Sequence, residues 1–243
     1  MQSRRVGSSI ASVVLLFGFG AGLVACGSGS NPSSSSSSSQ ASKLLAAALK
    51  NAIARQWVHE VIGASQPGHS FSEVNDIGAT AGRELIVSDG ARSTTLLVDH
   101  TVYLRGDAKA VVSYYHLPKH PRSYAGKWIS ISSKSRAYVS TSTGATLVSD
   151  FDHIKLLGPF SEGSVVTIDG VRAVPIIAHV TPTANSVTAV VTLYVTASGP
   201  TLPVEFHAVS GQITETITWS GWGHKVTIVA PHTSIPLATV LHG

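Results

Sequence analysis

RELIVSDGARSTTLLVDHTVYLRG, residues 83 to 106, contains apolar runs separated by two short turns, and it is the starting point for the architecture expected of the rest of the chain. Asp89-Gly90 is a two-residue hairpin signal, because a type I′ turn needs positive φ at both central residues, which Asp and Gly tolerate. Asp99-His100 is a second turn of the same length. The stretch therefore predicts a three-stranded meander over residues 83–88, 91–98 and 101–105.

Apolar residues occupy both faces of the second hairpin in this meander. Directly opposed residues of an antiparallel pair share a face. One face then carries Leu96, Val98 and Tyr103, and the other carries Leu97, Val102 and Leu104. Both faces need cover, so further elements must pack on this sheet.

The second half of the chain repeats the pattern. Asp169-Gly170 predicts another tight turn, and the segment that follows alternates apolar residues, including Val191 and Leu193, with threonines. Further strands are predicted at residues 202–209, 212–219 and 224–229. The chain thus contains about ten antiparallel strands.

One predicted strand carries a carboxylate on its apolar face. Ile217 and Trp219 share a face with Glu215. Such a carboxylate either lies at an exposed rim or is one of the few polar groups that orient a ligand in an apolar pocket. The sequence leaves both alternatives open.

Helices are predicted at the start and in the middle of the folded region. Residues 42–55 place leucines and alanines at helical spacing, which predicts an amphipathic helix with one face to cover. Asp107 is expected to cap a helix over residues 107–115, and a short helix from Ser149 is expected to close at Gly158. Strands with a leading helix and a mid-chain helical segment define an α+β fold.

The N-terminus has the features of an export signal. Two arginines precede an apolar, glycine-rich run that ends at Cys26, the only cysteine. Residues 23–26, LVAC, resemble the lipobox of bacterial lipoproteins, whose cysteine receives a diacylglyceryl group. We expect a signal peptide over residues 1–25, a lipidated Cys26 with a flexible serine-rich tether over residues 26–40, and one domain over residues 41–243.

Composition excludes several classes of partner. Loss of Arg4 and Arg5 with the signal leaves 15 basic and 13 acidic residues, so the mature chain is nearly neutral. The basic residues are scattered, which argues against nucleic acid as a partner. With its one cysteine used for lipid, the domain has no disulfide and depends on its core.

These elements together resemble the actinobacterial lipoproteins of the LprG and LppX type, which have a LolA-like half-barrel fold. The resemblance rests on the lipobox and tether, on VDHTVYLRG followed by YAGKWISI, and on LYVTASGPTLPVEF followed by ITETITWSGWGHKVTIVAP. It runs in order from about residue 41 to Pro231. It implies a curved antiparallel sheet that wraps helices around an apolar cavity.

No catalytic or metal-binding motif appears in the sequence. There is no HExxH, and Pro118 separates His116 from His120 in a way that breaks a shared helix face. A GxSxG elbow and a phosphate-binding glycine loop are also missing. Asp150 and Asp152 are interpreted as capping acids at a helix N-terminus. We therefore expect neither an enzyme nor a cofactor or metal site.

The predicted function is a membrane-anchored, extracytoplasmic envelope lipoprotein, a non-catalytic monomer that holds a lipid, glycolipid or other apolar ligand in the half-barrel. Candidate ligand-binding residues lie on the apolar strand faces: Leu96, Val98, Tyr103, Val191, Leu193, Glu215, Ile217 and Trp219. The alternative is an envelope protein-interaction or sensor module with a self-packed core and an exposed apolar patch on its rim or convex face.

Cys26→Ala is expected to change the location of the protein without changing its stability. The variant should fold, because Cys26 precedes every predicted packed element, but it should leave the membrane fraction or accumulate as unprocessed precursor, since acyl chains supply about 0.8 kcal/mol per buried methylene. Fractionation and the mass of the N-terminal peptide measure this. A correctly cleaved, membrane-bound alanine variant, together with a wild-type peptide that carries no acyl mass, would contradict the lipoprotein prediction.

Overall fold

The computed structural model describes residues 32–113, 121–142, 144–151, 159–180 and 189–242. Helix α1 (Pro32–Ala54) precedes the strands. Strands β1 to β6 span Trp57–Gln66, His69–Gly78, Gly82–Ser88, Ala91–Val98, Thr101–Gly106 and Ile129–Ser132. Strands β7 to β13 span Phe160–Glu162, Val166–Ile168, Val171–Val180, Ala189–Thr196, Pro203–Ser210, Ile213–Ser220 and Ile235–Pro236.

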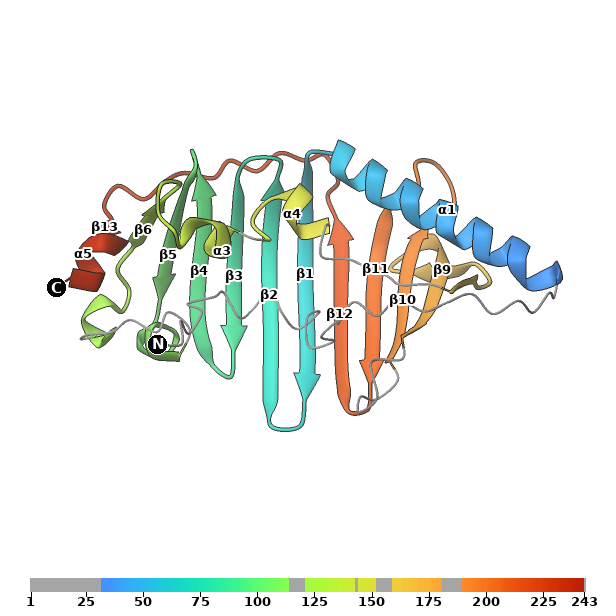
Figure 1. Cartoon of the computed structure of the whole chain (residues 1–243), viewed down its shortest axis with the longest axis horizontal. Coiled ribbons are helices and arrows are strands. Elements are labelled where there is room, and N and C mark those ends of the chain that lie inside the picture. The colour runs from blue at the N-terminus through green and yellow to red at the C-terminus, as the bar shows by residue number, and fades with distance from the viewer. Residues whose placement is uncertain (1–31, 114–120, 143, 152–158, 181–188, 243) are drawn as a thin grey trace.

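The described strands form one open sheet of thirteen strands, in the order β13-β6-β5-β4-β3-β2-β1-β12-β11-β10-β9-β7, with β8 also paired to β9 (Figure 1). All pairs are antiparallel except β13 with β6. The sheet does not close, because its path ends at β13 and β7. The predicted α+β half-barrel is confirmed, with more strands than the ten expected.

The predicted hairpins form at the predicted turns. Positive φ angles occur at Asp89 (49°) and Gly90 (80°), at Asp99 (47°) and His100 (58°), and at Asp169 (47°) and Gly170 (82°). Leu96 lies opposite Tyr103, and Leu97 lies opposite Val102, as the meander required. Turn chemistry therefore determines the register of both halves of the sheet.

The two central strands were not predicted. Strands β1 and β2 pair along their whole length around the Pro67-Gly68 turn, and β1 joins the two halves of the sheet by pairing with β12. Their inward faces carry polar residues among the apolar ones, so the alternation that marks a half-buried strand is interrupted. Conversely, the strand predicted at residues 224–229 is wrong, because this segment has no ladder partner in the described structure.

Helix α1 begins earlier than predicted. The structure places Pro32 to Gln40 in the helix, where the sequence predicted a flexible tether, and that prediction is wrong for these residues. Proline is accommodated in the first turn of a helix, and serine costs only about 0.5 kcal/mol relative to alanine per helical position, so the amphipathic segment that follows extends toward the N-terminus. Whether residues 26–31 form a tether stays a prediction.

Helices α1, α3 (Tyr138–Ser142) and α4 (Leu147–Phe151) lie on one face of the sheet, which we call the helix-covered face (Figure 1). Two apolar clusters lie beneath them. The larger joins α1 and α4 to the sheet near β12, and the smaller joins α3 to β4, β5 and β6. The core is therefore divided into two parts.

The remaining helices lie near the ends of strands. Helix α2 (Ala108–Ser113) starts at the predicted cap, since Asp107 Oδ1 accepts a hydrogen bond from the Ala110 amide at 2.8 Å. The 3-10 helix η2 (Pro121–Tyr124) contacts α2, and α5 (Leu237–His242) closes the described chain. Helix α4 begins at Leu147 instead of Ser149, and its expected end at Gly158 lies outside the described residues.

Gly82 permits the loop between α3 and α4 to approach β3. A Cβ at this position would collide with the backbone carbonyl of Ala145. Ala145 is buried in the smaller apolar cluster, so the absence of a side chain at Gly82 brings the cluster against the sheet. This contact holds α4 over β1 and β2, where the polar residues lie.

Candidate functional site

A row of polar side chains crosses the middle of the helix-covered face. Glu60 of β1 is directly opposite Asn75 of β2, Asn75 is opposite Glu84 of β3, and Glu84 is opposite Thr95 of β4. Directly opposed residues share a face, so these side chains emerge side by side. Together with Glu73 of β2 and Asp150 of α4, we call Glu60, Asn75 and Glu84 the acidic strip.

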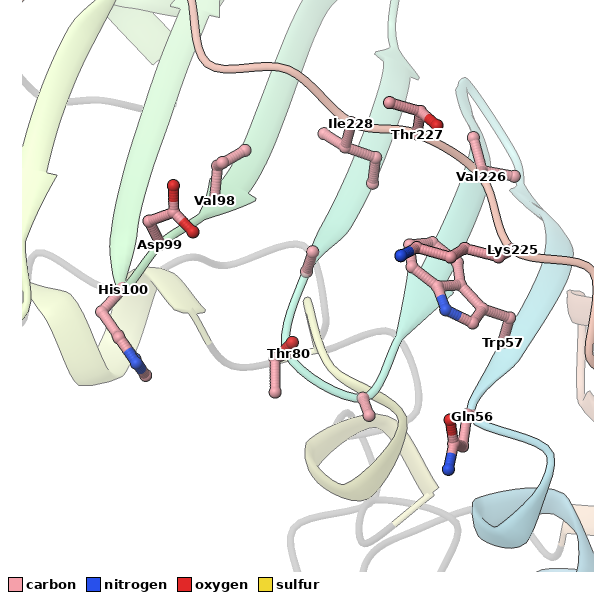
Figure 2. Close-up of a pocket in the computed structure, with 12 residues that line it drawn as sticks. Gln56, Trp57, Thr80, Val98, Asp99, His100, Lys225, Val226, Thr227 and Ile228 are labelled. Carbon is pink, nitrogen blue, oxygen red and sulfur yellow. The ribbon is translucent and has the colours of Figure 1, made fainter.

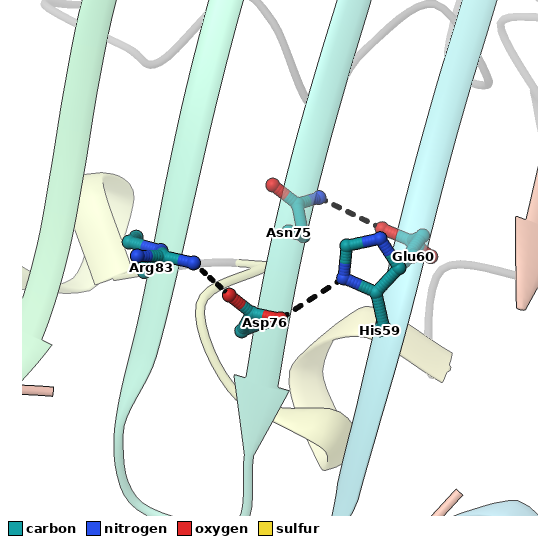
Figure 3. A network of polar contacts seen from close by, with 5 residues as sticks. All are labelled: His59, Glu60, Asn75, Asp76 and Arg83. Atoms are coloured by element: carbon teal, nitrogen blue, oxygen red, sulfur yellow. Dashed lines mark hydrogen bonds and ion pairs between the residues drawn. The ribbon is translucent and has the colours of Figure 1, made fainter. Parts of the chain in front are cut away.

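Glu60 is the centre of the strip. Its side chain is almost fully buried, with 1% of the residue surface exposed. Asn75 Nδ2 donates to Oε1 at 2.8 Å, as Figure 3 shows, and Trp219 Nε1 donates to Oε2 at 2.7 Å. Both carboxylate oxygens are therefore occupied by donors from neighbouring strands.

Asn75 connects a second carboxylate to the first. Its Nδ2 also donates to Glu73 Oε1 at 2.7 Å, so both amide hydrogens are engaged. The residue is 3% exposed, yet its Oδ1 is buried without a hydrogen-bond partner. In Figure 3 this oxygen points away from Glu60 toward β3, the strand that carries Glu84. A buried amide oxygen without a donor is unusual and costs free energy.

Asp150 joins the strip from helix α4, which lies on the helix-covered face. Asp150 lies in the first turn of α4, as expected for an acid at a helix N-terminus, but its side chain does not form the cap. Thr146 and Ser149 make the capping hydrogen bonds at the start of α4, whereas the Asp150 carboxyl reaches Glu60. Its Oδ2 is buried without a partner. Asp152 lies outside the described residues.

Burial governs the electrostatics of the strip. It raises the pKa of Glu60, although hydrogen bonds from Asn75, Trp219 and Asp150 partly offset the effect. Burial, together with the charge of Glu60, raises the pKa of Asp150 well above its usual range. A hydrogen bond between two carboxyls requires a proton on one of them. That bond favours the charged form of Glu60 and the neutral form of Asp150.

The other two acids follow the same rule. Burial and the charge of Glu84 raise the pKa of Glu73 well above its usual value. Burial raises the pKa of Glu84 to about 7, although the Thr95 hydroxyl donates to it. The strip therefore holds protons at a pH at which exposed glutamates have lost them.

The opposite face of the same strands carries a compensated ion network. Asp76 accepts from His59 Nδ1 at 2.9 Å and from the Arg83 guanidinium (Figure 3). Burial opposes ionisation of Asp76, but the hydrogen bonds from His59 and Arg83 outweigh it and hold the pKa below its usual value. The basic groups near the strip are thus engaged on the far side of the sheet.

The predicted ligand-binding residues do not form one surface. The structure brings together five on the helix-covered face: Val191, Leu193, Glu215, Ile217 and Trp219. Leu96, Val98 and Tyr103 lie on the opposite face, because Leu96 is in the same cross-strand row as Arg83 and Asp76. No single small ligand contacts both sets.

Glu215 is not at an exposed rim. It is 5% exposed and lies between Ala64 and Ala208 on the helix-covered face. Burial and the charge of Glu60 raise its pKa to about 7. Of the two alternatives left open by the sequence, the rim position is therefore excluded.

A separate pocket of about 610 Å³ lies at one end of the sheet (Figure 2). It is lined by the start of β1, by the β2–β3 and β4–β5 turns, and by residues 225–228, and it includes Trp57, Val98, His100 and Lys225. Its volume is within the range of small-molecule pockets. Val98 is the one predicted ligand-binding residue that contacts it.

The described part of the chain contains neither a candidate metal cluster nor a helix that could span a membrane. No group of three histidine, cysteine or acidic side chains there is placed to hold a metal ion. Within the same ranges, no helix has the length and apolar character needed to cross a membrane.

Comparison with solved structures finds chains of similar fold. LprF from Mycobacterium bovis is 17% identical, with a TM-score of 0.49, over 79% of this chain and 97% of LprF. The Mycobacterium tuberculosis lipoprotein LppX is 15% identical, with a TM-score of 0.48, over 77% of this chain and 99% of LppX. A chain of the Pseudomonas aeruginosa MucA/MucB complex is 17% identical, with a TM-score of 0.38, over 74% of this chain and 55% of its own.

No family model and no curated protein matches the sequence. LprF and LppX are of the type that the sequence resembles. At these identities the likeness extends to the fold alone.

The acidic strip, together with Glu215, predicts an inverted pH dependence of stability. Glu84 and Glu215 have folded pKa values of about 7 against a usual 4.5, so the folded protein holds protons that the unfolded chain has released in this window. The free energy of unfolding should therefore fall as pH rises from 4.5 to 7, by up to about 1.4 kcal/mol per pH unit for the buried Glu215. The low pKa of Asp76 acts only below its usual 3.8, outside this window.

Urea unfolding at several pH values measures the slope. Glu215→Gln and Glu84→Gln should each flatten it, and Glu162→Gln, at an exposed glutamate of β7, should leave it unchanged. A wild-type protein whose stability is constant or rises over this window would show that these carboxyls are not buried.

Proposed function

We propose that this protein is a lipid-anchored, non-catalytic binding protein of the cell envelope that holds an amphiphilic ligand on the helix-covered face. One observation carries the proposal: a buried polar strip with unpartnered acceptors lies between two apolar clusters. A core that served only for folding would be uniformly apolar, because buried polar atoms without partners destabilise the protein. A ligand with an apolar part and a polar part matches this arrangement.

The apolar residues around the strip support the binding of a ligand with an apolar part. Val58 and Ile62 flank Glu60 on β1, and Ile77 follows Asn75 on β2; all three contact or belong to the larger cluster. Phe151 of α4 stacks near Trp219, with 5.7 Å between ring centroids, directly beside the Trp219–Glu60 hydrogen bond. Polar groups fixed in an apolar setting are the usual means by which a binding site orients a ligand.

The proposed anchor also places the domain. Cys26 lies outside the described residues, and α1 begins soon after it in sequence, at Pro32. At a maximum of about 3.6 Å per residue, the connection spans roughly 20 Å. Lipidation of Cys26 would therefore hold the domain close to the membrane surface, at the distance from which a carrier exchanges lipid.

Native mass spectrometry tests the binding function. The full-length chain with Cys26→Ala, which removes the predicted acylation site, is purified from an actinobacterial host and from a host without mycolic acids. We expect additional mass, released by organic extraction and belonging to an amphiphile, in at least one preparation. Protein that is empty from both hosts, and that stays empty after incubation with host lipid extract, would contradict ligand carriage.

The alternative function, a protein-interaction module, is favoured by one observation on the opposite face. Val61, Val74 and Leu85 form a directly opposed apolar row across β1, β2 and β3, and Val61 and Leu85 are 38% and 41% exposed. Such a row is where the interaction module was expected to present an apolar patch to a protein partner. Leu85→Lys distinguishes the two functions, because it alters this row and leaves the ligand mass unchanged if the helix-covered face is the binding site.

A further inference from the structure

We propose that the acidic strip binds a primary amine, or an equally cationic group that donates several hydrogen bonds, at the polar end of the ligand. The inference rests on the proposed function, and it names the chemistry of the ligand at that site. It is drawn from the hydrogen-bonding capacity that the strip leaves unused and from the distribution of charge on the two faces of the sheet.

The unused hydrogen-bonding capacity consists of acceptors. Asn75 has committed both amide hydrogens, to Glu60 and to Glu73, and its Oδ1 is free. Asp150 Oδ2 is also buried without a partner. A ligand group that satisfies these atoms must donate hydrogen bonds, because a carbonyl, ether or phosphate would bring further acceptors to them.

The acids on this face of β1 to β4 have no basic partner on the same face. The inward-facing residues of β1 to β4 around the strip are aliphatic, aromatic, hydroxyl, amide or acidic: Val58, Ile62, Phe71, Ile77, Ile86, Ser93, Thr95 and Leu97 accompany the strip itself. The nearby basic residues His59 and Arg83 are bonded to Asp76 on the opposite face. No described side chain of these strands therefore neutralises Glu60, Glu73 or Glu84.

An amine satisfies both conditions, whereas a hydroxyl satisfies one. A primary ammonium carries three donors and a positive charge, and hydrogen bonds between charged partners are about twice as strong as neutral ones. A hydroxyl has one donor and no charge. Burial of carboxylates without a counter-charge is unfavourable, so a cation that restores their ionised form gains the most in binding.

The strip is less deeply buried at one end than at its centre. Glu84 and Asp150 are half-buried, whereas Glu60 and Glu73 are 1% and 7% exposed. A polar group would therefore meet the Glu84 carboxyl first, and it would reach the Asn75 oxygen, which is fully buried, only after a local rearrangement of the side chains around that oxygen. The apolar part of the ligand would then lie against the clusters on either side of the strip.

Two amphiphiles with the same tail test the proposal. Decylamine and 1-decanol, below their aggregation limits, are titrated by calorimetry at pH 7.5 into the full-length Cys26→Ala chain after delipidation. We expect decylamine to bind at least tenfold more tightly than 1-decanol. Glu84→Gln, which removes a charge and keeps the side-chain shape, should reduce this ratio to threefold or less, and Glu73→Gln should reduce it as well.

Glu162→Gln is the matched control, because it removes a surface carboxylate at the edge of the sheet and should leave the ratio at its wild-type value. Near-ultraviolet circular dichroism establishes that each variant is folded, and Glu73→Gln serves in place of Glu84→Gln if the latter does not fold.

Equal affinity for the two amphiphiles, or a preference that survives both substitutions, would overturn the amine site while the proposed carrier function stands. Failure of both amphiphiles to bind would overturn the amine site, and an empty protein in mass spectrometry would then overturn the carrier function separately.

Discussion

The Glu60 carboxylate is the interaction on which the rest of the structure depends. It accepts hydrogen bonds from Asn75 on β2 and Trp219 on β12, two residues that flank β1 in the sheet, and it meets Asp150 of α4. Trp219 is 159 residues away in sequence. The bond therefore joins the N-terminal and C-terminal halves of the sheet at the seam between β1 and β12, and hydrogen bonds to a buried charge contribute about 1.5–3 kcal/mol each.

A buried acidic strip contributes less to the free energy of folding than an apolar core would. Well-packed apolar residues at the same positions would stabilise the fold at least as well, because buried ions lose their hydration. The strip also leaves two acceptors without partners, so it is not optimised for stability. Polar groups that cost stability and remain unsatisfied are a common property of binding sites, and this is the physical basis for proposing that the strip takes part in ligand recognition.

Much of the fold could be predicted, because its signals are local. The turns at Asp89-Gly90 and Asp169-Gly170 determine their hairpins through backbone conformation alone, and the Asp107 cap is equally local. The centre of the sheet was missed because Glu60 and Asn75 interrupt the apolar alternation of β1 and β2. The serine run was assigned to a tether, although a helix started by its C-terminal half continues through it.

The sequence singled out some residues near the strip, and their role in ligand binding stays a prediction. A carboxylate on an apolar strand face drew attention to Glu215, and the same signal at Glu60 and Glu73 would have indicated the strip once β1 and β2 were recognised. Trp219 was among the predicted residues, and the structure shows why it matters, since its indole N–H holds Glu60. The part played by Asp150 depends on α4 packing over β1, a contact between distant segments that no local pattern reveals.

The most direct measurement is the titration of individual side-chain carboxyls by carbon-detected nuclear magnetic resonance. If the strip is buried on the helix-covered face, Glu84 and Glu215 should titrate with midpoints near 7, and Asp76, on the opposite face, should stay ionised below its usual 3.8. If Glu84 and Glu215 instead titrate near 4.5, as exposed glutamates do, the strip is open to water and the Glu60-centred core does not exist as described.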